Sequence, residues 1–263
     1  MNNIELNKVA IQSIGIDTIR LPGVGSASAK GSGNLFHKSL VDAWFMSGYS
    51  NDNPPASIKG TRGHELVLKN FAFTSNSGFG GSVDHSGGND EGKAASSYEG
   101  SLVFDGVDDY AVCDNMPIQT DYTVICRRQI VNINNSSAVA SKRTYPDDIG
   151  NFGAFVIERV TANGSKALYS FGKDNAVDSF NSNQIIYQSK TAYNDRNIIA
   201  GDASDTNILS LGANAYNLSL GRCQEFSNVA IYYFALYDKS LTPDEIEQEK
   251  IKLNEIWTKR LNG

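Results

Sequence analysis

The carboxylates of this sequence could support two chemistries, hydrolysis of a glycosidic bond or coordination of a calcium ion. Hydrolysis requires two carboxylates that face each other across the scissile bond, and no strand-like Glu-x-Asp-x-x-Glu stretch occurs. Residues 245–249 belong to a helix-like stretch and residues 105–109 to a turn-like one. The histidines His37, His64 and His85 are scattered, with no serine or cysteine nucleophile around them. We therefore predict no catalytic residues and a protein that is not an enzyme.

Calcium binding is the alternative use of these carboxylates. Oxygen ligands gather in a glycine-rich stretch at residues 84–91 and in the turn-like stretch at residues 105–109. Neither spacing matches a known calcium loop, and Asp side chains in turns often accept hydrogen bonds from nearby backbone amides instead. We therefore predict no cofactor, with calcium as the alternative. The candidate metal ligands are Asp84, Asp90, Asp105 and Asp108.

Carbohydrate binding would use exposed aromatic rings that stack on sugar C–H faces, together with planar polar groups that bond to hydroxyls. The middle of the chain supplies both kinds of side chain within short stretches. The candidate carbohydrate-binding residues are Tyr145, Asp147, Asn151, Phe152, Tyr187, Tyr193 and Arg196. Core packing is the alternative, because an aromatic residue of a β-sandwich is more often buried than part of a binding surface.

The composition excludes several classes of protein. A formal net charge of -6 and a pI near 5.1 argue against nucleic acid as a partner, because phosphate binding requires clustered Lys and Arg. No apolar run of about 18 residues occurs, so we predict no membrane span. The first residues lack the basic start and apolar core of a signal peptide, which predicts folding in a cytoplasm. Three widely spaced cysteines, Cys113, Cys126 and Cys223, indicate small buried side chains and not a disulfide framework.

The pattern of short apolar alternations predicts an all-β sandwich. With 263 residues, 24 glycines and many Asn, Ser and Asp, the sequence favours short strands joined by tight turns. Residues 1–35 form an apolar arm and a Gly-rich linker that would serve in anchoring or oligomerisation, either by completing the domain's own sheet edge or by docking on a partner. Residues 36–263 form the sandwich domain, with a long surface loop at residues 75–100. The expected strands lie at residues 40–46, 58–60, 65–73, 122–131, 138–141, 152–159, 167–171, 184–188, 197–200 and 218–221, and a final strand opens the stretch that begins at Asn228.

The C-terminal stretch predicts a helix over residues 242–260. Thr242 suits the N-cap, Pro243 suits the first helical position, and Glu245 completes the spacing of a capping box. An apolar side made of Ile246, Ile251, Leu253 and Trp257 would pack this helix against the sandwich.

Two stretches, Ser101–Tyr110 and Asn228–Ile246, resemble the laminin-G-like branch of the concanavalin A-like lectin-glucanase jelly rolls. The first is expected to be a short hairpin around Asp105-Gly106, and the second a final strand followed by the capped helix. The resemblance implies a two-sheet antiparallel jelly-roll sandwich and a binding domain more than an enzyme. Where relatives commonly have a Trp in the strand after the hairpin, this sequence has Cys126 or Arg127, which weakens a sugar-stacking role there.

The stretch from Val41 to Phe73 is similar to virion proteins of crAss-like and related phages of gut Bacteroidales. This similarity implies a fibre or a capsid or tail decoration whose jelly roll binds host-surface polysaccharide, while residues 1–35 contact other virion proteins. It also implies a homo-oligomer, with a trimer as one stoichiometry, and location on a virion assembled in the host cytoplasm. The alternatives are a structural virion subunit that only braces its neighbours, and a glycan hydrolase.

Overall fold

The chain divides into two units, residues 1–33 and residues 34–263. The predicted arm and linker lie outside the described residues except for Leu35, so their roles stay predictions. The computed structural model describes residues 35–74, 76–80, 82–83, 96–117, 121–132, 139–142, 155–157, 159–160, 168–169, 184–191, 208–213 and 226–263.

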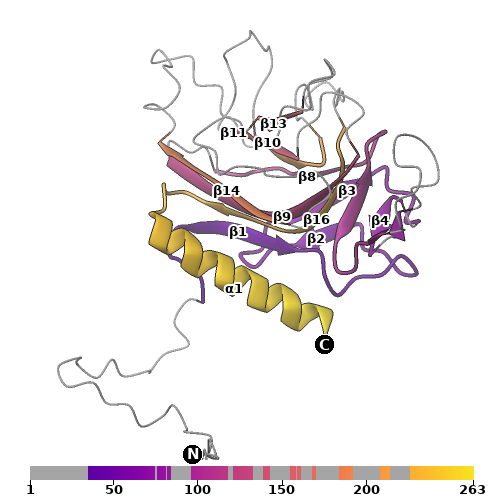
Figure 1. The fold of residues 1–263 in the computed structure, drawn as a ribbon, viewed down its shortest axis with the longest axis horizontal. Helices are drawn as coiled ribbons and strands as arrows, with labels where there is room; N and C mark the ends of the chain where they lie inside the picture. The colour runs from indigo at the N-terminus through magenta and orange to yellow at the C-terminus, as the bar shows by residue number, and fades with distance from the viewer. Residues whose placement is uncertain are drawn as a thin grey trace, which may run out of the picture. The chain divides into compact units, whose positions relative to one another are not determined.

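Two six-stranded sheets face each other, and all their strand pairs are antiparallel (Figure 1). Sheet A has the order β14 (Gln184–Thr191), β9 (Asp121–Asn132), β16 (Asn228–Tyr237), β7 (Leu102–Asp105) and β4 (Gly78–Phe79), and β1 (Leu40–Phe45) also pairs with β16. Sheet B has the order β11 (Phe155–Ile157), β10 (Ala140–Lys142), β15 (Leu209–Leu211), β8 (Tyr110–Cys113), β3 (Glu65–Lys69) and β2 (Ser57–Lys59). Two short pairs join β12 (Arg159–Val160) with β13 (Leu168–Tyr169) and β5 (Ser82–Val83) with β6 (Ser96–Ser97). The predicted all-β sandwich is confirmed.

Strand β16 lies in the middle of sheet A and is buried on both faces. Its β-branched and aromatic residues favour an extended backbone, and it pairs with β9 on one side and with β7 and β1 on the other. Val229, Ile231, Phe234 and Leu236 face the core between the sheets. A shift in the pairing register between Ile231 and Tyr233 interrupts the alternation. Strand β16 therefore also contributes side chains to a second core on the outer face of sheet A. These are Ala230, Tyr232, Tyr233, Ala235 and Tyr237.

Helix α1 (Pro243–Leu261) covers that outer face of sheet A (Figure 1). The capping box is confirmed, since the Thr242 hydroxyl accepts from the Glu245 N–H and the Glu245 carboxylate accepts from the Thr242 N–H. Ile246, Leu253 and Trp257 are buried against the sheet, but Ile251 is 59% exposed, so its expected place on the packed side is wrong. No helix in the described part of the chain is long and apolar enough to span a bilayer.

The expected hairpin at residues 101–110 is wrong, because its two strands belong to different sheets. Strand β7 pairs with β16 and β4, whereas β8 pairs with β3 and β15. The turn between them therefore carries the chain from sheet A to sheet B. We call this turn, residues 105–109, the aspartate corner.

Three other expectations about strands need correction. Strand β3 ends at Lys69 and not at residue 73, because Asn70 and Phe73 have φ angles of 66° and 52°, outside the extended region. The predicted loop at residues 75–100 contains the short strands β4, β5 and β6. Strand β15 was not expected, since its three residues are too short to show alternation. The strands expected at residues 197–200 and 218–221 lie outside the described residues.

Two of the three cysteines are described. Cys113 and Cys126 are free thiols buried in the core between the sheets, as predicted. Burial raises the pKa of the Cys113 thiol to about 12, so this thiol stays protonated and acts as a small apolar side chain. Cys223 lies outside the described residues.

Candidate functional site at the aromatic rim

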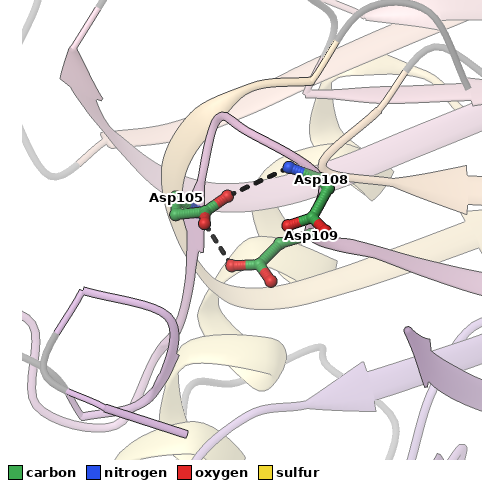
Figure 2. A group of neighbouring side chains, drawn as sticks. All are labelled: Asp105, Asp108 and Asp109. Carbon is green, nitrogen blue, oxygen red and sulfur yellow. Dashed lines mark hydrogen bonds between the residues drawn. The ribbon is translucent and has the colours of Figure 1, made fainter. Parts of the chain in front are cut away.

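The carboxylates of the aspartate corner hold its backbone (Figure 2). Oδ1 of Asp105 accepts hydrogen bonds from the N–H groups of Val107, at 2.7 Å, and Asp108, at 3.3 Å. Oδ2 of Asp109 accepts from the N–H of Asp105 at 3.0 Å. Gly106 has a φ of 77°, and a Cβ atom there would lie 3.0 Å from the backbone nitrogen of Asn228. The corner thus depends on the carboxylates of Asp105 and Asp109 and on Gly106, which confirms that these two aspartates are turn formers.

Asp109 is the unusual member of the corner because its side chain is fully buried. Desolvation by burial raises the pKa of this carboxyl from 3.8 to about 7, and the charges of Asp105 and Asp108 add to the rise. The Ser77 hydroxyl and the Asp105 N–H partly oppose it. Oδ1 of Asp109 has no hydrogen-bond partner among the described residues. The group therefore changes its charge near neutral pH.

The corner brings together one carboxylate oxygen each from Asp105, Asp108 and Asp109, all within 4.8 Å of one another. Such a group could hold a cation, but the hydrogen bonds to backbone N–H groups already use one oxygen of Asp105 and one of Asp109. Asp84 and Asp90 lie outside the described residues. That the protein has no cofactor, with calcium as the alternative, stays a prediction.

A set of partly exposed aromatic side chains lies beside this corner. We define the aromatic rim as Tyr49, Phe71 and Phe73, each of which packs on the core and is only partly buried. Tyr49 contacts Phe79 with 5.1 Å between ring centroids, and Phe79 is 6.1 Å from Phe73. Phe71 lies 5.9 Å from Phe73 and 5.1 Å from the buried Phe104. The rim is thus a continuous run of rings in which the core residue Phe79 joins Tyr49 to Phe73, and Phe71 also contacts the core through Phe104.

Residues 70–74, which follow β3 and which we call the rim loop, have a strained backbone conformation. A φ of 52° at Phe73 is rare for a bulky side chain, and such strain persists only where surrounding contacts impose it. The Asn51 carboxamide supplies one such contact, since it accepts from the Phe79 N–H at 2.7 Å and donates to the Phe79 carbonyl at 2.9 Å. The Ser77 hydroxyl supplies another by accepting from the Ala72 N–H at 2.8 Å.

Asn70 connects the rim loop to the aspartate corner. Its side-chain Nδ2 donates to the Asp108 carbonyl at 3.0 Å, and strands β3 and β8 pair directly at Lys69 and Tyr110. The exposed polar side chains of Asp52 and Thr74 flank the rim in the chain. Rigid rings with polar neighbours form a surface that could stack on the apolar face of a ligand and bond to its polar groups.

The grouping of the predicted carbohydrate-binding residues stays a prediction, because nearly all of them fall outside the described part of the chain. Tyr145, Asp147, Asn151, Phe152, Tyr193 and Arg196 lie outside the described residues. Tyr187 belongs to β14 and pairs in register with Ile125, but its side chain is also outside the described part. The signal for the rim was present in Asn70-Phe-Ala-Phe73, which looked like the end of a strand because its phenylalanines alternate.

Two histidines have partners that the sequence analysis missed. Nδ1 of His37 lies 2.7 Å from the Ser39 hydroxyl, and its Nε2 lies 3.4 Å from Glu245. This contact between His37 and Ser39 was not foreseen from the sequence. The contact is a local one, because the same Nδ1 also accepts from the Ser39 backbone N–H at 3.2 Å and Ser39 is only 9% exposed. The arrangement ties the first described residues to the start of α1.

The other pair, His64 and Asp42, stabilises a loop. Asp42 is fully buried and accepts from the backbone N–H groups of Ala43, Arg62 and His64. It also accepts from the Thr61 hydroxyl at 3.1 Å and lies 3.0 Å from Nδ1 of His64. All of these bonds serve to fold residues 60–64 against β1.

No family model matches the chain, and no curated protein is similar to it in sequence. The fold is similar to solved structures of Trypanosoma rangeli sialidase. The sialidase in complex with sialic acid aligns with a TM-score of 0.50 and 12% identity over 84% of this chain and 34% of the sialidase chain. A sialidase mutant displaying trans-sialidase activity aligns with a TM-score of 0.48 and 10% identity over 83% and 33% of the two chains. The chain spans about a third of the sialidase it matches, and at this identity the likeness shows the fold alone.

Proposed function

We propose that this protein is a non-enzymatic virion protein, a fibre or a capsid or tail decoration, whose sandwich binds host-surface glycan through the aromatic rim. The observation that carries the proposal is the strained, pre-formed loop that holds Phe71 and Phe73 partly exposed beside Tyr49. Ring faces fixed before binding lose little conformational entropy when a sugar stacks on them. Positive φ angles at bulky residues such as Phe73 cluster at ligand-binding and other functional sites, which supports a binding role for this loop.

The chemistry of the described carboxylates supports binding without catalysis. Asp42 accepts five hydrogen bonds, and Asp105 and Asp109 hold the corner backbone. Glycoside hydrolysis instead requires an acid and a second carboxylate that are free to face one bond. We therefore propose that the glycan leaves the protein unchanged.

The place on a phage particle rests on the similarity of residues 41–73 to virion proteins. A single rim of three rings would bind a sugar weakly, and many copies on one particle would raise the overall avidity without any new contact. Residues 1–35 would supply the attachment to other virion proteins or to further copies of this chain, with a trimer as one outcome.

Glycan-array binding by the full chain tests the proposal. We expect binding to host-surface polysaccharide that is lost in Phe71→Ala and Phe73→Ala and kept in Ile251→Ala, which removes an exposed apolar side chain from helix α1. Thermal melting of each variant separates loss of the rim from loss of the fold. Absence of binding to any capsule extract, or new reducing ends in the incubated polysaccharide, would refute the proposal.

A further inference from the structure

We infer that the aromatic rim selects uncharged glycan and discriminates against sugar acids such as sialic acid and hexuronic acids. The inference rests on the proposed function and names the ligand class of the same site. The inference does not follow from the likeness in fold, because the sialidase with a similar fold was solved in complex with sialic acid, which is itself a sugar acid.

The charges around the rim are mainly negative. Among the described residues of segments 46–55, 69–80 and 105–109, the acidic side chains are Asp52, Asp105, Asp108 and Asp109, and Lys69 is the one cation. Asp52 and Asp108 are exposed, so their charges act at the surface where a ligand would approach. A sugar carboxylate would meet like charge there, which disfavours its approach.

Two described arginines use their guanidinium groups in contacts with other side chains. The Arg127 guanidinium lies 4.2 Å from the Trp257 ring centroid and donates to Asn254 at 2.7 Å. The Arg260 guanidinium lies 5.0 Å over the Phe45 ring.

Two further arginine side chains are described. Arg128 is fully buried in sheet A, and the backbone N–H of Arg62 donates to Asp42 in the loop at residues 60–64. Planar recognition of a carboxylate is the particular property of the guanidinium group. Among the contacts of the described residues, none joins a guanidinium group to a side chain of the rim.

Stacking on Phe71 and Phe73 uses the apolar C–H faces of a sugar ring and does not need a charged group on the ligand. A neutral sugar can make this contact, whereas a sugar acid would have to bring its carboxylate close to the exposed charges of Asp52 and Asp108, against which the described segments set the single cation Lys69.

Matched pairs of oligosaccharides test the inference with the full-length protein. Each pair differs only in its terminal sugar, a neutral hexose in one member and sialic acid or a hexuronic acid in the other. We expect the neutral member to bind and the acidic member to bind roughly tenfold more weakly or not at all. Phe73→Ala should remove binding of the neutral member, and Asp52→Lys should narrow the difference within each pair. Ile251→Ala is the control and should behave as the wild type.

Each outcome decides the inference. Equal or tighter binding of the acidic members overturns it while leaving glycan binding itself intact. Binding of neutral glycan that Phe73→Ala does not change places the ligand elsewhere and also overturns it. Failure of every pair to bind overturns the proposed function and the inference together. Weaker binding of acidic members that Asp52→Lys partly restores supports both.

Discussion

The buried carboxyl of Asp109 should make the stability of the sandwich depend on pH, and Asp109→Asn should remove that dependence. The native state keeps this carboxyl protonated up to about pH 7, whereas the unfolded chain loses the proton near its ordinary pKa of 3.8. Between these values the native state therefore binds more protons than the unfolded state, so the free energy of unfolding falls as the pH rises. Above about pH 7 the native state contains a buried charge and the loss is complete.

The size of the effect follows from the shift in pKa. A rise from 3.8 to about 7 corresponds to about three pH units at roughly 1.4 kcal/mol each, or up to about 4 kcal/mol in total. Asn keeps an oxygen that can accept from the Asp105 N–H but has no charge to bury. We expect the two proteins to be similar in stability near pH 4, and Asp109→Asn to be the more stable near pH 8 by up to that amount.

Urea unfolding at a series of pH values measures this difference, with the fluorescence of the buried Trp44 and Trp257 as the probe. Asp108→Asn is the control, since it removes the same charge from an exposed position of the same corner and should keep most of the wild-type slope. Parallel profiles for the wild type and Asp109→Asn between about pH 4 and pH 8 would show that Asp109 is not a buried titrating group.

Three further predictions concern the corner, the helix and the metal. Gly106→Ala should lower the free energy of unfolding by more than about 1 kcal/mol, because its φ of 77° and the approach of Asn228 both exclude a Cβ atom; an unchanged urea midpoint would contradict this. Thr242→Ala should lower it by about 1 kcal/mol through loss of the capping box, measured by circular dichroism on melting, and Thr242→Ser should keep most of that stability. Millimolar calcium should leave the melting temperature unchanged, because the turn already uses oxygens of Asp105 and Asp109; a clear rise, absent in Asp108→Asn, would show that the corner holds the ion.

The fold class could be predicted from the sequence because strand alternation and the helix signals are local. The apolar run from Asn228 to Tyr237 and the Thr242 capping box both act within a few residues, and the structure has both where the pattern indicated. The hairpin at residues 101–110 failed because local turn chemistry does not determine the partners of the two strands. Asp105-Gly106 forms a turn in either case, but here the strands that it joins pair in different sheets.

The aromatic rim could not be predicted for a related reason. Phe71 and Phe73 alternate like strand residues, and only the positive φ angles of Asn70 and Phe73 take them out of the sheet. The loop that has these angles is contacted by Ser77 and by Asn51, whose Nδ2 lies 3.5 Å from the Thr74 carbonyl, and Asn51 is distant from the loop in sequence. The buried state of Asp109 was equally hidden, since its neighbours Asp105 and Asp108 are partly or fully exposed turn residues.

Chemical-shift mapping during titration of the full chain with a neutral host-surface oligosaccharide tests the binding role of the rim most directly. We expect chemical-shift changes that saturate and cluster at Tyr49, Phe71 and Phe73, while the signals of helix α1 stay unchanged. Shifts centred on another face of the sandwich, or no shifts at the rim while the glycan binds, would contradict that role.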